Sequence, residues 1–285
     1  GQLAWKKDLY REFQVRDKPD WGTCSSPLVV DGKLIVNPGG REAALVALDP
    51  ATGEIVWKAP GRKAAYGSFI AVAHADRTEL VGYDATSLGG WDAATGRRLW
   101  SVVPPQPHDF NVPTPLLAPA AGPGEKLLVV STENNGTRAY RFSSDGTLAS
   151  RPVAECPELA PDSQTPVVLD VRASRDDRPR PRLFGVWQGL HCLDLRADHL
   201  LRPIWTAADP AFDNYAVVIG CGNRILIVAN TGEFLLVDAA ADAYRLISRL
   251  KVFEDDEGVY AHPALVGTRL YLRGSDEVVC LELGS

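Results

Sequence analysis

The sequence Asp-Pro-Ala-Thr-Gly-Glu-Ile-Val-Trp at residues 49–57 returns as Asp-Ala-Ala-Thr-Gly-Arg-Arg-Leu-Trp at residues 92–100. Both copies follow an apolar segment, and both end in a second short apolar segment that carries the Trp. Asp and Thr side chains hydrogen-bond turn backbone, and Gly tolerates positive φ. The motif therefore predicts a hairpin turn followed by an outgoing strand.

A second element opens each repeat unit: a polar residue, usually a Pro, and then an apolar run. The form with Pro occurs at residues 26–30, 114–117, 165–169 and 262–266. Pro is tolerated at the first residue of a strand because no ladder hydrogen bond is lost there. Together the two elements predict units of four short strands at about 26–62, 66–105, 112–157, 163–209 and 213–253, with a shorter unit at 258–285.

The shorter unit lacks a fourth strand, and residues 1–10 resemble an isolated fourth strand with Trp5 at the motif position. Four-stranded units with a period of about 40–50 residues are typical of a β-propeller. Pairing the N-terminal strand with the last unit would remove an open sheet edge. We therefore expect an all-β fold, a single six-bladed propeller domain over residues 1–285. If the parent protein is longer, its ring has seven or eight blades.

The composition is that of a globular protein, with 45% hydrophobic and 23% charged residues among 285. The formal net charge of −6 argues against nucleic acid as a partner. No apolar run approaches the length of about 18 residues that a membrane helix needs. The chain contains no Met, so we expect a mature chain or a piece of a longer one.

Two residue types are assigned to the core. Trp5, Trp57, Trp100 and Trp205 are predicted to dock one blade against the next. The five Cys include no C-x-x-C pair and mostly adjoin apolar residues, which predicts small buried hydrophobes. One long-range disulfide remains an alternative, because the sequence does not show which two Cys would pair.

The repeats resemble those of pyrroloquinoline-quinone-type (PQQ-like) propellers, most clearly at residues 47–57 and 91–100. Residues 21–30, 37–40 and 260–273 also look like a bacterial, planctomycete-type group of these proteins. The resemblance implies one of three kinds of member: a quinoprotein dehydrogenase with PQQ and Ca²⁺, an outer-membrane assembly lipoprotein that binds proteins, or an exported protein of the planctomycete type.

The dehydrogenase resemblance implies two adjacent Cys against the quinone, and this sequence has no adjacent Cys. The lipoprotein resemblance implies a lipidated N-terminal Cys, whereas residue 1 is Gly. We therefore expect no cofactor, no metal and no catalytic residue, with PQQ and calcium as the alternative.

The polar residues just before each strand opener are candidates for a binding site. In a propeller the innermost strands start near one mouth of the central channel, so these side chains are predicted to converge there and bind a ligand or peptide. Alternatively they cap strand ends. The candidates are Tyr66, Ser68, Asn111, Gln164, Asn214, Tyr215, Tyr260 and His262.

Residues 172–182 carry five Arg in eleven positions. This run indicates either an acidic partner or a solvated hairpin loop.

Taken together, these features favour a noncatalytic binding scaffold, exported to the periplasm or cell surface, that holds a protein segment or a small ligand. The alternatives are a PQQ- and calcium-dependent dehydrogenase or its remnant, and the C-terminal blades of a larger receptor.

Overall fold

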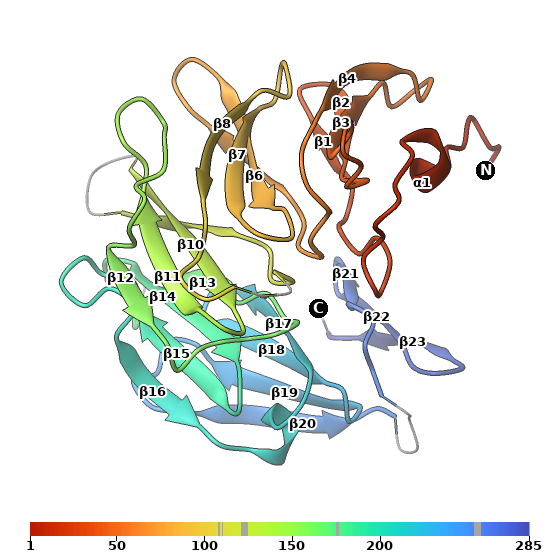
Figure 1. Cartoon of the computed structure of the whole chain (residues 1–285). Helices are drawn as coiled ribbons and strands as arrows, with labels where there is room; N and C mark the ends of the chain where they lie inside the picture. The colour runs from red at the N-terminus through yellow and green to blue at the C-terminus, as the bar shows by residue number, and fades with distance from the viewer. Residues whose placement is uncertain (108, 110, 121–124, 175–176, 254–257, 285) are drawn as a thin grey trace. The chain divides into compact units, whose positions relative to one another are not determined.

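The structure is a computed structural model that describes residues 1–107, 109, 111–120, 125–174, 177–253 and 258–284. Within these residues the strands form six antiparallel sheets, five with four strands and one with three. In every sheet the strands follow one another in chain order (Figure 1). This is the β-propeller predicted from the repeats, and the six sheets coincide with the six predicted blades.

The first three sheets occupy the N-terminal half of the chain. A four-residue helix, α1 (Leu9–Glu12), precedes them. Their strands are β1 (Leu28–Val30), β2 (Lys33–Val36), β3 (Leu45–Leu48) and β4 (Ile55–Ala59); β5 (Ile70–Ala73), β6 (Thr78–Tyr83), β7 (Leu88–Asp92) and β8 (Arg98–Val102); and β9 (Leu116–Pro119), β10 (Lys126–Thr132), β11 (Gly136–Arg141) and β12 (Ala154–Cys156).

The last three sheets follow in the same order, with one 3₁₀ helix, η1 (Pro210–Phe212), between the first two of them. Their strands are β13 (Val167–Val171), β14 (Arg180–Val186), β15 (Leu190–Asp194) and β16 (Pro203–Ala207); β17 (Ala216–Cys221), β18 (Arg224–Ala229), β19 (Glu233–Asp238) and β20 (Leu246–Lys251); and β21 (Ala264–Val266), β22 (Arg269–Arg273) and β23 (Val278–Glu282).

The chain divides into two compact units. Unit 1 comprises residues 1–117 and 126–162, and unit 2 comprises residues 118–125 and 163–285. The sequence predicts a single domain, and that stays a prediction.

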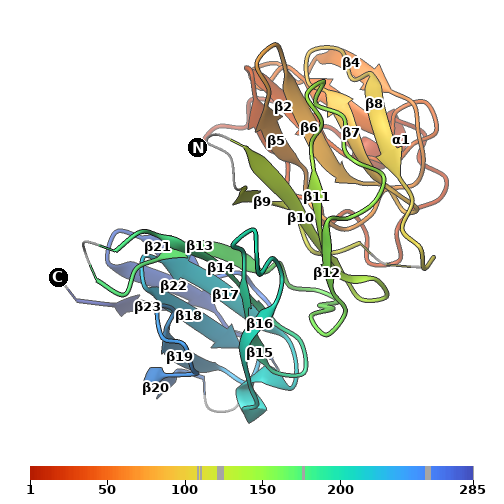
Figure 2. The ribbon, with the colours of Figure 1, turned by 90° about the vertical axis from the view of Figure 1, so that its left-hand side faces the viewer.

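Each unit is held together by apolar side chains between neighbouring sheets. In unit 1, Leu45 and Leu80 belong to a cluster shared by β1–β4 and β5–β8. In unit 2, Phe184 and Ile227 belong to a cluster shared by β13–β16 and β17–β20, which lie side by side in Figures 1 and 2. The third strands β3 and β15 are buried along their whole length. One face of β3 packs against β5–β8, and the other packs against the N-terminal segment through Phe13 and Val15.

The repeated motif forms the turn that its chemistry predicts. Asp49 Oδ1 accepts hydrogen bonds of 2.8 Å from the amides of Ala51 and Thr52, and Gly53 has φ +74°. Asp92 makes the equivalent bonds, and Gly96 has the same φ of +74°. A register shift precedes the turn in both sheets, between Ala47 and Leu48 and between Gly90 and Trp91.

The structure differs from two expectations. The predicted N-terminal strand was wrong: residues 1–8 form no strand, α1 begins at Leu9, and the last sheet, β21–β23, has three strands. Closure of the ring by the N-terminal segment stays a prediction. The Cys prediction was wrong for three residues: Cys24, Cys221 and Cys280 are exposed, and only Cys156 and Cys192 are buried. Cys221 ends β17, and Cys280 lies on β23, the edge strand of the three-stranded sheet. All five thiols are free.

Candidate functional site

In unit 1 the predicted mouth residues bind backbone of neighbouring connections. The Tyr66 hydroxyl accepts a hydrogen bond of 3.0 Å from the amide of Asp20, and Ser68 Oγ accepts one of 2.9 Å from the amide of Ser26. Asn111 is 3% exposed, and its Nδ2 donates to the carbonyl oxygen of Asp84 at 3.3 Å. These three side chains therefore join segments that are 27 to 46 residues apart in the chain.

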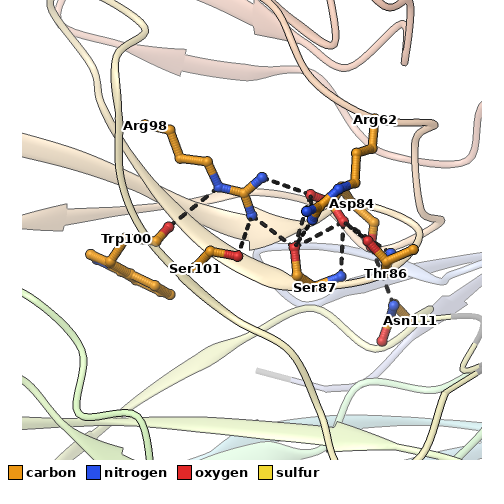
Figure 3. Close-up of polar contacts among 8 residues, drawn as sticks. All are labelled: Arg62, Asp84, Thr86, Ser87, Arg98, Trp100, Ser101 and Asn111. Carbon is orange, nitrogen blue, oxygen red and sulfur yellow. Dashed lines mark hydrogen bonds and ion pairs between the residues drawn. The ribbon is translucent and has the colours of Figure 1, made fainter.

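Asp84, which sequence reasoning missed, is the centre of the densest polar cluster around these connections (Figure 3). It follows β6, and its Oδ1 accepts hydrogen bonds from the amides of Thr86 at 2.9 Å and Ser87 at 2.8 Å. Its Oδ2 lies 2.8 Å from Arg98 Nη1 and 3.4 Å from Arg62 Nη1. A single carboxylate thus orders a hairpin and holds two guanidinium groups.

The charge balance keeps Asp84 ionised. Burial by itself would raise the pKa of Asp84, but hydrogen bonds from the Thr86 backbone and from Arg98 outweigh it and lower that pKa. The Arg98 guanidinium also lies over the Trp91 ring, 4.6 Å from its centroid. The sequence signal was the Asp-Ala-Thr-Ser turn, but its Arg partners lie 14 and 22 residues away.

In unit 2 most of the predicted mouth residues are more exposed to solvent than those of unit 1. Gln164 is buried and accepts a hydrogen bond from Ser163 Oγ at 3.1 Å. Asn214, Tyr260 and His262 are exposed, and the Tyr260 side chain is 61% exposed. The ring centroids of Tyr215 and Tyr260 are 5.6 Å apart. The structure therefore brings together two aromatic rings from connections 45 residues apart, before β17 and before β21.

Three of the four predicted docking tryptophans lie against the turn of another sheet. Trp57 Nε1 donates to the carbonyl oxygen of Ala93 at 3.2 Å, and Trp205 Nε1 donates to that of Ala241 at 3.2 Å. Trp5 Nε1 donates to the carbonyl oxygen of Pro50 at 3.0 Å. Trp100 differs, because its Nε1 donates to the buried carboxylate of Glu79 in its own sheet.

Unit 1 also contains a cleft of about 530 Å³ between the segment after α1 and the edge of β1–β4, which sequence reasoning missed. Four basic side chains line it, and three acidic ones accompany them: Arg16, Arg41, Lys58, Lys63, Glu12, Asp17 and Glu42. Lys63 and Asp17 form an ion pair of 2.8 Å. The volume is in the range of small-molecule sites.

The alternative of a quinone and calcium site concerns the metal-binding and thiol side chains of the described residues. No group of three His, Cys, Asp or Glu side chains within them is arranged to hold a metal ion. The Cys residues are not adjacent in the sequence. No chemical step through PQQ is derived for this chain.

Six sheets with this turn motif and these tryptophan contacts define a β-propeller of the PQQ-like repeat class. A family model described as outer membrane protein assembly factor BamB matches residues 1–174, more than half of the 285 residues. The chain belongs to this family. No curated protein sequence matches it.

Three solved structures to which this chain is similar follow. BamB from Moraxella catarrhalis is 16% identical, with a TM-score of 0.48 over 91% of this chain and 84% of that one. The computationally designed Ika8 protein is 10% identical, with a TM-score of 0.58 over 91% and 70%. The quinohemoprotein alcohol dehydrogenase ADHIIG from Pseudomonas putida HK5 is 13% identical, with a TM-score of 0.57 over 88% and 55%.

For the two structures with TM-scores above 0.5, the likeness at these identities establishes the fold alone. Among the described residues, no helix is long and apolar enough to cross a membrane.

Proposed function

We propose that this chain is a noncatalytic binding scaffold, exported to the periplasm or the cell surface, that holds a protein segment or a small ligand. The observation that carries the proposal is the contact between the partly buried Tyr215 and the exposed Tyr260, with ring centroids 5.6 Å apart. Tyr is enriched among the residues that dominate binding energy at interfaces. The family, described as an outer-membrane protein assembly factor, supports both the role and the location.

The binding surface in this proposal consists of Asn214, Tyr215, Tyr260 and His262. All four belong to unit 2, and three of them are exposed. Tyr66, Ser68 and Asn111 belong to unit 1 and are not part of this surface, because hydrogen bonds to backbone already engage them.

A photo-crosslinking amino acid at position 260 tests the proposal in cells that produce the full protein. We expect it to capture one defined partner, whose isolated segment then binds the purified chain. Tyr260→Ala should weaken that binding at least about tenfold. Tyr271→Ala is the matched control, because Tyr271 is another exposed tyrosine of unit 2. Equal affinity of the Tyr260→Ala variant and the parent chain would refute the proposed surface.

The alternative is a PQQ- and calcium-dependent dehydrogenase or its remnant. It is tested by calorimetric titration of the purified chain with PQQ in the presence of Ca²⁺. Saturable binding with a stoichiometry near one would favour the quinoprotein, and a dye-linked dehydrogenase assay would follow. Absence of heat would favour the scaffold.

A further inference from the structure

A small pocket of about 220 Å³ lies in unit 2, where the start of β14 faces the turn between β19 and β20. Three arginines, two aspartates and one isoleucine line it: Arg180, Arg182, Arg196, Asp194, Asp242 and Ile204. Two of the arginines come from the basic run at residues 172–182, of which 175 and 176 lie outside the described residues. The lining has a formal charge of +1, in a chain whose net charge is −6.

Arg182 forms the buried wall of this pocket. Its side chain is 2% exposed, and its Nη1 donates to the carbonyl oxygens of Ala239 at 3.1 Å and Ala241 at 2.6 Å. Its Nη2 donates to Asp242. Its Nε is buried and has no hydrogen-bond partner within the part of the chain that the structure describes. The Arg182 side chain also interacts with the thiol of Cys192 and lowers the pKa that burial raises there.

The other two arginines have unused donors. Arg196 uses Nε and Nη2 on the Asp194 carboxylate, at 2.9 and 2.5 Å from Oδ2. Arg180 reaches Asp242 at 3.6 Å and makes no other hydrogen bond or ion pair with a described residue. A guanidinium carries five N–H donors, so both side chains can donate further bonds into the pocket.

The aspartates set the charge that the pocket can accept. Burial would raise the pKa of Asp194, but hydrogen bonds from Arg196 outweigh it and lower that pKa, so Asp194 is ionised at neutral pH. One added monoanion neutralises the formal charge of +1. A phosphate dianion would leave an excess negative charge close to two carboxylates.

We propose that this pocket is a second binding site, which takes a single carboxylate from an acidic residue of a partner peptide. The carboxylate lies between the guanidinium groups of Arg180 and Arg196, which match its geometry. The volume suits one such group rather than a drug-sized ligand, which needs at least about 300 Å³. This site involves none of the residues of the aromatic surface and stands independently of the proposed function.

The test is an NMR titration of the purified full chain at low ionic strength, following the Arg Nε–H signals. The probe is a capped Gly-Ser-Glu-Ser-Gly peptide, and the same peptide with Gln replaces it in the neutral arm. We expect saturable shifts with the Glu peptide only, and at least about tenfold weaker binding for R180Q and for R196Q. Equal binding of the Gln peptide would overturn the proposal.

Arg224→Gln is the matched control. The Arg224 side chain is 51% exposed and pairs with Asp238 at 3.6 Å, whereas the Arg196 side chain is 50% exposed and pairs with Asp194. We expect R224Q to bind the Glu peptide as the parent chain does. An equal loss in R224Q would show a general charge effect and refute the site. Tighter binding of inorganic phosphate than of the Glu peptide would refute the charge argument.

Two further measurements separate binding from folding. Unfolding midpoints of R180Q and R196Q should stay close to that of the parent chain, and if R196Q is unfolded, R180Q alone decides. Tyr260→Ala should leave the titration unchanged. If the test of the aromatic surface refutes the proposed function, the carboxylate site is unaffected. If this titration refutes the carboxylate site, the proposed function is unaffected.

Discussion

The indole ring of Trp57 lies against Gly96 of the following sheet. A Cβ added at Gly96 would come within 2.5 Å of Trp57 Cε3, and one added at Gly53 would come within 2.7 Å of Trp5 Cδ2. In each case the Trp belongs to one repeat or segment and the Gly to the next. The Trp and Gly of the Asp-x-x-Thr-Gly-x-x-x-Trp motif therefore form a contact between successive repeats.

Gly96→Ala is expected to destabilise the protein by about 2–4 kcal/mol, through steric overlap with Trp57 and strain at positive φ. Gly32→Ala is the matched control: Gly32 has φ +71°, and an added Cβ there meets no atom within 4 Å. It should cost only about 1 kcal/mol, the strain alone. Denaturant unfolding measures both. Equal losses would show that the Trp57 contact contributes nothing.

Trp5→Ala is expected to lower the free energy of unfolding by about 2–4 kcal/mol, because the half-buried indole packs on Gly53 and donates to Pro50. Leu3→Ala serves as the control in the same segment, since Leu3 is exposed and surface truncations usually cost below about 0.5 kcal/mol. Chemical denaturation of both variants checks this. A loss below about 1 kcal/mol for Trp5→Ala would contradict its role in docking.

Asp84→Ala is expected to cost about 3 kcal/mol, because it removes the acceptor for the Thr86 and Ser87 amides and leaves the Arg98 guanidinium without its carboxylate. Arg62→Gln removes the 3.4 Å pair with Asp84 and a 2.9 Å hydrogen bond to Ser87 Oγ, both made by a half-exposed side chain, and should cost below about 1 kcal/mol. Thermal and denaturant unfolding distinguish the two. Similar losses would mean that the hairpin bonds of Asp84 are unimportant.

Glu79 makes stability depend on pH. Its side chain has no exposed surface, its Oε2 lies 2.8 Å from His74 Nε2, and burial raises the pKa of Glu79 from its ordinary value of 4.5. The folded state then holds this proton to higher pH than the unfolded state. The stability from this group is complete below pH 4.5 and is lost as pH rises through the raised pKa.

Glu79→Gln should therefore remove part of the stability loss between about pH 4.5 and neutrality. Unfolding midpoints measured across this range for the variant and the parent chain should diverge as pH rises, with the variant gaining. Glu54→Gln, at an exposed position, should give a curve parallel to that of the parent. Parallel curves for Glu79→Gln would contradict the effect of burial.

Three of the five thiols should react quickly with a thiol reagent in the folded protein, namely the exposed Cys24, Cys221 and Cys280. Burial raises the pKa of Cys192 to about 12 and also raises that of Cys156, so both lack thiolate at neutral pH. All five should react after denaturation. The triple variant C24S/C221S/C280S should lose the fast phase, and a remaining fast phase would show that a buried thiol is accessible.

The sequence alone was sufficient to predict the repeat period, the six blades and the turn chemistry of Asp49 and Asp92. These features are local: an Asp carboxylate, a Thr three residues later and a Gly at positive φ need only their neighbours in the chain. The tryptophan spacing was equally visible. The different contact of Trp100 could not be predicted from the sequence, because its Nε1 donates to Glu79, and no local pattern shows that Glu79 is buried.

Only the tertiary structure decided which polar side chains are hydrogen-bonded to backbone and which are exposed. In the sequence, the same position before a strand opener is held by five polar residues: Tyr66, Ser68, Asn111, Tyr260 and His262. In the structure the first three make hydrogen bonds to backbone, whereas the last two are exposed. The same holds for Arg182, whose partners lie 57 to 60 residues away. Hydrogen bonding and charge compensation depend on distances in space between segments far apart in the chain. The hydrophobic and turn patterns that specify the strands do not determine those distances.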